Sequence, residues 1–220
     1  MDIYHCNNEA HFVATAVKQI IEAMNGFQAG GENITVGLSG GKTPRPVYGE
    51  LGKSPEVDWQ RVTFFLVDER YVSAQSEASN RKMIEATLLR GPAQAAKRIL
   101  PDTSLPLEKC IKDYSASLKN MTPDIVILGL GGDGHIASLF PPLTLDAEGA
   151  TVIHTVTDKF EVRDRISVTL PLLKHAKRRF FLISGKTKYE LLEKMRKIPA
   201  DIINYPAQEL FDERTTWIVM

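Results

Sequence analysis

One junction constrains the fold of this chain more than any other segment: a buried apolar strand that runs directly into a glycine-rich turn. Residues 125–128 are Ile-Val-Ile-Leu, and four of the next seven residues are glycine. Residues 136–140 then have the composition of a helix start. A strand, a glycine turn and a helix start are how α/β proteins place polar groups at the carboxyl edge of a sheet. The turn contains an acid and an imidazole, Asp133 and His135, and this pair indicates proton transfer.

Strand-like and helix-like segments alternate along the whole chain. Apolar residues recur at helical spacing in residues 10–24, and short apolar runs bounded by glycine or polar turns predict strands. Thr43 and Ser79 are suited to be helix N-caps. Helices are expected at residues 10–24, 44–51, 79–89, 107–118 and 186–197, and strands at residues 33–37, 62–67, 99–100, 151–157, 165–170, 180–184 and 216–219.

Consecutive strand–helix units favour an α/β fold of the modified doubly wound, Rossmann-like kind, with a mostly parallel sheet and helices on both of its faces. The two strands expected between residues 151 and 170 have no helix between them, which allows an antiparallel excursion. No repeat, low-complexity tract or linker divides the sequence, so residues 1–220 are expected to form one domain.

Composition and charge exclude several classes of function. Lys and Arg total 27, as do Asp and Glu, so no bulk field draws the chain to nucleic acid or to an acidic membrane. No apolar run approaches the ~18 residues needed to span a bilayer, and the N-terminus lacks a signal-peptide pattern. The two cysteines, Cys6 and Cys110, have neither disulfide-framework nor metal-ligand spacing. We therefore expect a cytoplasmic protein, and the cysteines indicate no metal site.

Polar and cationic residues follow several of the expected strands. They are found at residues 39–43, 68–70 and 133–135, at the Gly185–Lys188 turn, and at Arg163 and Arg165. The carboxyl ends of parallel strands share one sheet edge, so these groups can meet in one cleft. Cations and exposed backbone N–H groups at such an edge suit a small anionic ligand, above all a phosphorylated one.

Two literal motif matches favour nucleotides less than they first suggest. Residues 129–134 fit the dinucleotide pattern GxGxxG, but they lie past the middle of the chain and include a carboxylate that would crowd a pyrophosphate. Residues 40–43 resemble the end of a P-loop, but Val36 occupies the place of its first glycine. Taken singly, each of these groups also has an ordinary structural interpretation. Residues 68–70 could form a solvated ion pair, Lys186 and Lys188 could lie on a helix surface, and His135 could be a hydrogen-bonded loop residue.

The motifs taken together resemble the 6-phosphogluconolactonase family, in which glucosamine-6-phosphate isomerases are also grouped. The resemblance rests on five segments in order, which span nearly the whole chain: residues 38–44 (LSGGKTP), 65–72 (FLVDERYV) with Ser79 and Asn80, 128–141 (LGLGGDGHIASLFP), 165–171 (RISVTLP) and 184–188 (SGKTK). It implies a sugar-phosphate isomerase/deaminase-like fold. The implied reaction is hydrolysis of 6-phospho-D-glucono-1,5-lactone to 6-phospho-D-gluconate, a step of the oxidative pentose phosphate pathway, without a cofactor or metal.

Two alternatives stay open at this point. Glucosamine-6-phosphate deaminases have a similar pattern, but they carry Asp-Glu-Tyr where this chain has Asp68-Glu69-Arg70, and Phe-Asn-Glu-Pro where it has Ser-Leu-Phe-Pro at residues 138–141. The second alternative is a sugar-phosphate-binding module without turnover. Such modules normally accompany a DNA-binding helix-turn-helix, for which this chain has no spare length.

The resemblance also implies roles for individual residues. His135 is the expected general base, and Asp133 is expected to fix its tautomer or help to position the attacking water. The substrate's phosphate is expected on the loop formed by Ser39, Gly40, Gly41, Lys42 and Thr43, with further charge from Arg165 and Lys188. Asp68 and Arg70 complete the predicted binding residues, with open roles. The expected partner is the phosphorylated sugar lactone, bound by a monomer or a weak homo-oligomer.

Overall fold

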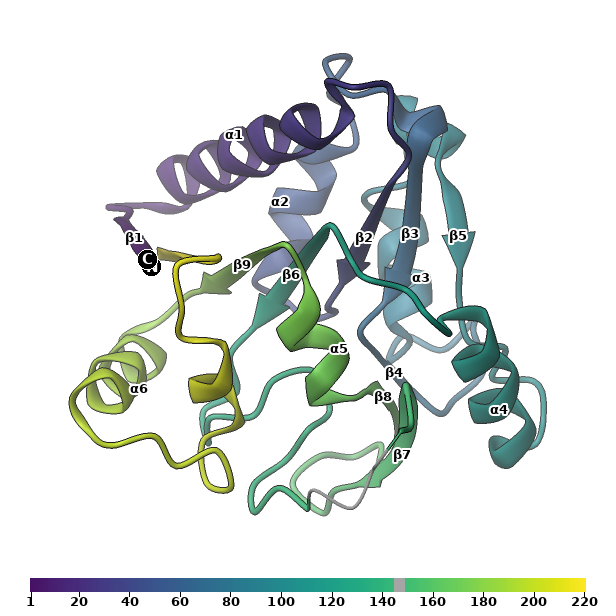
Figure 1. Cartoon of the computed structure of the whole chain (residues 1–220), viewed down its shortest axis with the longest axis vertical. Helices are drawn as coiled ribbons and strands as arrows, with labels where there is room; N and C mark the ends of the chain where they lie inside the picture. Colours follow the sequence, from purple (N-terminus) through teal and green to yellow (C-terminus); the bar gives the residue numbers. More distant parts are fainter. Residues whose placement is uncertain (145–148) are drawn as a thin grey trace.

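A seven-stranded sheet, in which all neighbouring strands run parallel, forms the centre of the fold (Figure 1). The computed structural model describes residues 1–144 and 149–220. In spatial order the strands are β1 (Asp2–His5), β10 (Thr215–Val219), β9 (Arg178–Ile183), β6 (Ile125–Gly129), β2 (Ile34–Leu38), β3 (Val62–Leu66) and β5 (Lys97–Ile99).

Helices cover both faces of this sheet, and alternate strand residues anchor the two layers. Phe64 and Phe180 belong to one buried cluster, while their neighbours Phe65 and Phe181 belong to the other. The first cluster includes side chains of α1 (Glu9–Gln28), α2 (Pro44–Leu51) and α3 (Asn80–Ala86), and the second includes side chains of α4 (Leu107–Ser117), α5 (Leu170–His175) and α6 (Lys186–Lys197). Figure 1 shows α5 in front of the sheet and α2 behind it. The predicted fold class is confirmed.

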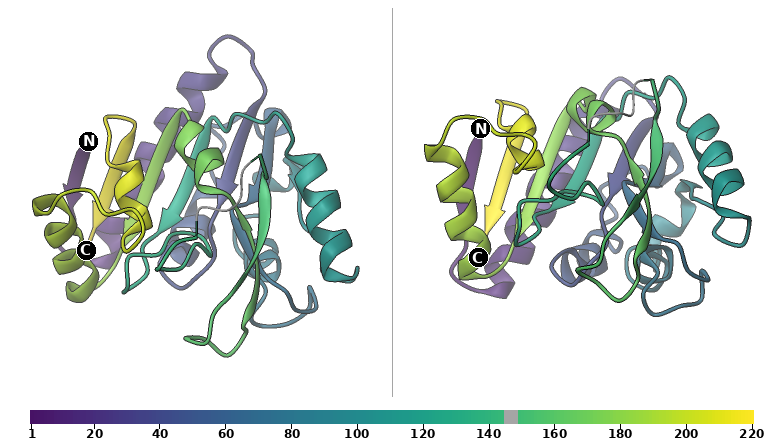
Figure 2. Two further views of the ribbon diagram at one scale, coloured as in Figure 1. Left: turned by 60° about the horizontal axis from the view of Figure 1, so that its bottom comes forward. Right: turned by 90° about the horizontal axis from the view of Figure 1, so that it is seen from below.

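A second, three-stranded antiparallel sheet stands off the first one (Figure 2). Its order is β4 (Asp68–Arg70), β8 (Asp164–Val168) and β7 (Val152–Val156), which confirms the antiparallel excursion. The chain changes sheets directly after Leu66. The Tyr114 hydroxyl holds this corner, because it donates to the Leu66 carbonyl at 2.6 Å and accepts from the Leu66 amide at 3.0 Å.

Three local predictions are wrong in whole or in part. Residues 136–140 form no helix: Ile136 and Leu139 make an isolated antiparallel bridge, and Ala137 between them has φ +49°. The reason is tertiary, because the amide and hydroxyl of Ser138 bond to other segments instead of to a helical ladder. Thr43 takes the N-cap position of α2 as expected but makes no side-chain capping bond, whereas Ser79 accepts from the Lys82 amide as expected. The helix expected at residues 79–89 ends at Ala86.

Three of the strands and helices lack a sequence prediction. The edge strand β1 is short and largely exposed, so it has no alternating apolar pattern. Helix α5 begins at Leu170, where a strand was expected to end, and Pro171 lies in its first turn. Residues 68–70 also form a strand of the second sheet instead of the end of a main-sheet strand.

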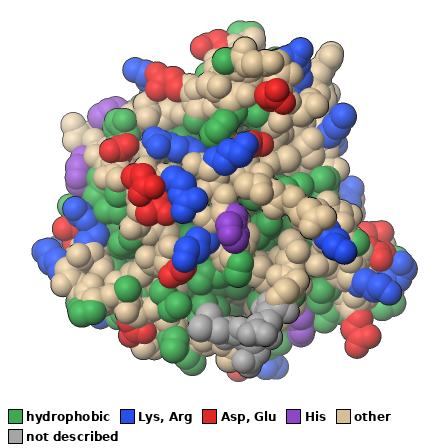
Figure 3. Space-filling view, viewed as in Figure 1, with side chains coloured by type: hydrophobic (Ala, Val, Ile, Leu, Met, Phe, Trp, Pro, Cys, Tyr) green, Lys and Arg blue, Asp and Glu red, His purple; other side chains and the backbone are tan. Residues whose placement is uncertain are grey.

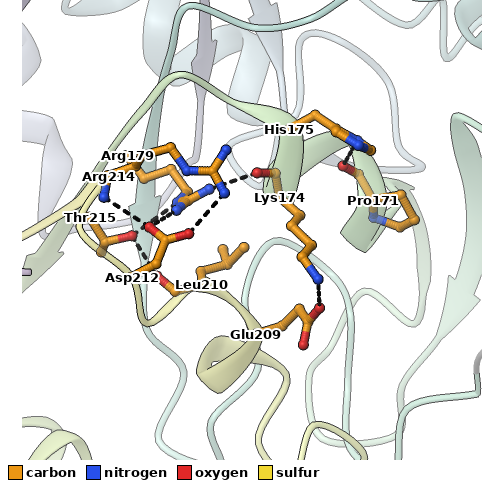
Figure 4. Close-up of polar contacts among 9 residues, drawn as sticks. All are labelled: Pro171, Lys174, His175, Arg179, Glu209, Leu210, Asp212, Arg214 and Thr215. Atoms are coloured by element: carbon orange, nitrogen blue, oxygen red, sulfur yellow. Dashed lines mark hydrogen bonds and ion pairs between the residues drawn. The ribbon is translucent and has the colours of Figure 1, made fainter.

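Charged side chains of both signs are present on the surface. Figure 3 shows Lys, Arg, Asp and Glu side chains on the face that it presents. The most buried cation is Arg179, which is fully buried at the amino end of β9 and pairs with Asp212. Figure 4 shows that Arg214 joins the same carboxylate. In the described part of the chain, no helix has the length and apolar character required to cross a membrane.

Candidate active site

A cavity of about 360 Å³ opens at the carboxyl ends of β2, β6 and β9 and is bounded on one side by the small sheet. Ten of the residues predicted for the site line this cavity: Ser39, Gly40, Gly41, Lys42, Thr43, Asp68, Arg70, His135, Arg165 and Lys188. Asp133, the remaining predicted residue, lies behind His135 and faces a neighbouring hollow. Chain segments up to 149 residues apart in sequence therefore meet at one place. Residues 39–43, His135 and Lys188 follow strands that end at the same edge of the main sheet, whereas Asp68, Arg70 and Arg165 come from the small sheet that packs beside that edge.

The loop between β2 and α2 forms one wall and requires glycine at two positions. A Cβ atom on Gly40 would lie 1.8 Å from Asn80 Oδ1, and Gly41 has φ +108°. The loop is held at its start, because the buried Tyr48 hydroxyl donates to the Ser39 carbonyl at 2.9 Å. The Ser39 hydroxyl oxygen is itself buried without a hydrogen-bond partner among the described residues. It is a polar group on the cavity wall that a ligand could satisfy.

Two carboxylates on β4 have different surroundings. Asp68 faces the cavity and accepts from Ser138 Oγ at 2.7 Å and from Asn80 Nδ2 at 3.2 Å. Glu69 points away from the cavity and accepts from the amides of Asn80 and Arg81 at the start of α3. Burial raises the pKa of Glu69, although these amide hydrogen bonds oppose the rise. Glu69 therefore fixes the helix that carries Asn80, and Asn80 in turn holds Asp68.

Four cations face the cavity without a carboxylate partner among the described residues. Lys42 lies in the β2–α2 loop, Arg70 and Arg165 are directly opposed in the β4–β8 register, and Lys188 lies in the first turn of α6. No ion pair within 4 Å involves any of them in the part of the chain that the structure describes. Burial, and secondarily Arg70, lowers the pKa of Arg165, and burial lowers the pKa of Lys188. Bringing cations together without a counter-charge is unfavourable, so this wall is suited to an anion.

His135 is fixed by contacts on two sides. Its Nδ1 lies 2.6 Å from Asp133 Oδ1, and the other oxygen of Asp133 is paired with Lys159 Nζ. The imidazole is 4.8 Å from the Phe140 ring and 5.9 Å from the Phe160 ring, between centroids.

The tautomer of His135 follows from this geometry. Burial would raise the pKa of Asp133, but the hydrogen bonds from His135 and Lys159 hold it well below its ordinary value. An ionised carboxylate can only accept, so Nδ1 carries a proton, and in the neutral ring Nε2 is then the nitrogen with the free lone pair. Since His135 lines the cavity, the arrangement can accept a proton from a group bound there.

Sequence reasoning missed several residues of the site. Lys159 and Phe160 lie in the connection between β7 and β8, an irregular segment without a pattern that marks it as functional. Ser138 had been placed in a helix that does not form. Two other cations singled out by sequence, Arg163 and Lys186, lie outside the cavity. Arg163 pairs with Asp158, and Lys186 is exposed near Glu190.

Comparison with known proteins gives a consistent result. Residues 7–218 match the sequence family described as glucosamine-6-phosphate isomerases/6-phosphogluconolactonase. A probable 6-phosphogluconolactonase of Dictyostelium discoideum is 38% identical over 192 residues, which cover 83% of this chain and 81% of that protein. The 6-phosphogluconolactonase of Thermotoga maritima is 33% identical over 217 residues, covering 96% and 95%.

Solved structures agree with the sequence matches. A crystal structure of 6-phosphogluconolactonase from Thermotoga maritima superposes with a TM-score of 0.86 over 99% of this chain and 98% of that chain, at 33% identity. A monomeric glucosamine-6-phosphate deaminase superposes with a TM-score of 0.85 at 18% identity, which shows that the same fold is shared.

Proposed function

The chain belongs to the glucosamine-6-phosphate isomerase/6-phosphogluconolactonase family, and on that premise we propose that it hydrolyses 6-phospho-D-glucono-1,5-lactone to 6-phospho-D-gluconate. Relatives bearing the name 6-phosphogluconolactonase are 32–38% identical and match most of the chain. The observation that carries the proposal is the cavity itself, where a histidine whose Nε2 makes no hydrogen bond among the described residues faces cations that have no carboxylate partner in the same part of the chain. One side supplies a base, and the other supplies charge for a phosphate.

The phosphate is proposed to bind at the β2–α2 loop. Its oxygens would accept from the backbone amides of residues 40–43 and from the Ser39 hydroxyl, which has no partner among the described residues. Lys42, Arg165 and Lys188 would add charge-assisted hydrogen bonds. Arg70 shares the cation wall through its register with Arg165, so we assign it to the same anion-binding role.

His135 is proposed to act as the general base. Nε2 takes a proton from water as the water oxygen forms a bond to C1 of the lactone, and the negative charge moves to the carbonyl oxygen. The C1–O5 bond then breaks, and the proton on Nε2 passes to O5, so the open-chain acid and the neutral imidazole are released. Asp133 stabilises the transient imidazolium and holds the ring in position. Amides of the glycine turn or an arginine would stabilise the oxyanion.

This mechanism uses protein groups alone. A δ-lactone is an activated ester, so one base worth about 10²–10⁴-fold, with charge stabilisation, supplies a useful acceleration. Among the described residues, no group of three or more His, Cys, Asp or Glu side chains is arranged to hold a metal ion. The mechanism therefore predicts that a chelator leaves the rate unchanged.

The test is a coupled assay. Glucose-6-phosphate dehydrogenase generates the lactone in place, and 6-phosphogluconate dehydrogenase reports the product as NADPH, against a control without the protein for spontaneous opening. A clear acceleration that persists in chelator supports the proposal. A rate equal to the control contradicts it, and ammonia release from glucosamine 6-phosphate then tests the deaminase alternative.

We further propose that residues 1–220 act as one domain, as a monomer or a weak homo-oligomer. A cytoplasmic location is proposed as well. The free, buried thiols of Cys6 and Cys110 support it, because unpaired cysteines are typical of reducing compartments.

A further inference from the structure

The connection between β7 and β8 reaches over the histidine of the site. This connection, residues 157–163, is termed here the hairpin tip. It contributes two adjacent side chains: Lys159 pairs with Asp133, and the Phe160 ring packs edge-on against His135. The tip is held in place, because the Thr157 amide donates to the Arg163 carbonyl at 3.1 Å and Arg165 Nε donates to the Val162 carbonyl at 2.9 Å.

Lys159 contacts the pair formed by Asp133 and His135, termed here the dyad, but it does not line the cavity wall. The wall includes His135 and Phe160, whereas Asp133 and Lys159 lie behind the imidazole. The Lys159 side chain is 52% exposed, and the Asp133 side chain is 25% exposed. Within the same tip, Arg163 pairs with the exposed Asp158 and does not contact the dyad. Lys159 is therefore placed to act on Asp133, and through it on His135.

The contact between Lys159 and Asp133 affects how readily His135 can act as a general base. A carboxylate beside an imidazole stabilises the protonated ring, and a protonated ring cannot accept a proton from water. Asp133 uses one oxygen to orient His135, and Lys159 places a positive charge on the other oxygen. The orientation is kept while part of the charge is cancelled.

We propose that Lys159 is a positioning residue that keeps His135 in its neutral, proton-accepting form by sharing Asp133 and offsetting its charge. The inference rests on the proposed function, since it assigns a purpose to the base of that reaction. It adds a third residue, supplied by the small sheet, to a dyad that the glycine turn supplies.

Other charged groups face the same space. Arg165 lies over the Phe160 ring at 5.4 Å from its centroid, and Arg70, Lys42, Lys188 and Asp68 line the cavity. All of these remain when Lys159 alone is replaced. A change in the protonation of His135 in a Lys159 variant therefore reports the contribution of Lys159.

The test uses Lys159→Met, which removes the charge and retains most of the side-chain length, and Lys159→Arg, which retains the charge. Arg163→Met is the matched control, because it removes a cation from the same tip without touching Asp133. For each protein, kcat/KM is measured from pH 5 to pH 8 in the coupled assay. The His135 ring signals are titrated by NMR in parallel and assigned by their absence in His135→Asn.

In Lys159→Met we expect the midpoint of the acid limb of kcat/KM and that of the ring titration to move up together by roughly 0.5–1 pH unit, because one half-exposed charge is lost. KM should change less than about twofold, since Lys159 does not line the cavity. Lys159→Arg should restore the wild-type midpoint, and Arg163→Met should keep it.

Unmoved midpoints in Lys159→Met would overturn the inference. A midpoint shift in Lys159→Arg as large as that in Lys159→Met would overturn it as well. A raised KM with an unchanged pH profile would also overturn it, because that result assigns Lys159 to substrate binding. The ring titration needs no substrate. If the wild-type protein lacked lactonase activity, the titration would still decide whether Lys159 controls His135.

Discussion

Replacing Gly131 with alanine should displace and disable His135 while leaving residue 135 itself a histidine. A Cβ atom on Gly131 would lie 2.1 Å from His135 Nδ1 and 2.2 Å from Cε1. The backbone of Gly131 is not left-handed, so alanine suits it and the clash is confined to the side chain. Gly132→Ala is the matched control for the turn: Gly132 also lines the cavity, but no atom of the described residues lies within 4 Å of its added Cβ, and the substitution keeps its backbone amide.

The magnitude follows from the distances. Ordinary contact begins near 3.4 Å, so the ring must retreat from 2.1 Å by about 1.3 Å. A shift of that size breaks the 2.6 Å bond between Nδ1 and Asp133 and misaligns Nε2. A misplacement of about 1 Å can cost a factor of ~10², or about 2.7 kcal/mol of transition-state stabilisation. We therefore expect kcat/KM of Gly131→Ala to fall about 100-fold, while Gly132→Ala stays within about twofold of wild type.

The coupled lactonase assay measures both variants, and circular dichroism and thermal unfolding check that they fold alike. A Gly131→Ala protein that retains wild-type kcat/KM would refute the reasoning, because it would show that the imidazole need not occupy its observed position. Equal losses in the two variants would also refute it, since the loss would then come from the turn instead of the ring.

Three further predictions concern binding and stability. Lys188→Ala should mainly raise KM, by about tenfold, because it removes one charge from the anion-binding wall, and initial rates against lactone concentration measure this. Ser138→Ala should lower the free energy of unfolding by about 1–3 kcal/mol in urea titrations, because the buried hydroxyl donates to Asp68 at 2.7 Å. Asp212→Ala should cost about 3–5 kcal/mol at pH 7, because it leaves Arg179 buried and unpaired (Figure 4). Burial would raise the pKa of Asp212, but the hydrogen bonds from Arg179 and Arg214 lower it, so the stabilisation that ionised Asp212 gives is present at neutral pH and is lost as the pH falls through the acid range. In urea titrations, the difference in free energy of unfolding between wild type and Asp212→Ala should therefore become smaller from pH 7 toward pH 3. A difference that stays constant would contradict the assignment.

Patterned segments of the fold were predictable from sequence, and segments decided by tertiary contacts were not. The central strands are continuous apolar runs buried on both faces, so strands such as β6 and β9 are recognisable without a structure. Residues 136–140 have an equally apolar sequence, but the bonds that Ser138 makes with Asp68 and Ser167 turn them into a bridge. Local propensity could not reveal partners 29 and 70 residues away.

The same distinction holds for the site. The loop at residues 39–43, Asp68 and His135 follow strands, and the rule that parallel strands end at one edge brings them together. Lys159 and Phe160 come from a connection whose position depends on how the small sheet packs, so no spacing along the chain indicates them. The burial of Glu69 behind the cavity wall is likewise a tertiary result.

The central claim is that His135 is the base that activates water for lactone hydrolysis. The most direct test is kcat of His135→Asn beside the wild-type protein in the coupled assay, with spontaneous opening subtracted and matched folding confirmed by thermal unfolding. We expect kcat to fall by about 10²–10⁴-fold while the protein remains folded. A folded His135→Asn protein whose kcat stays within about threefold of wild type would contradict this assignment.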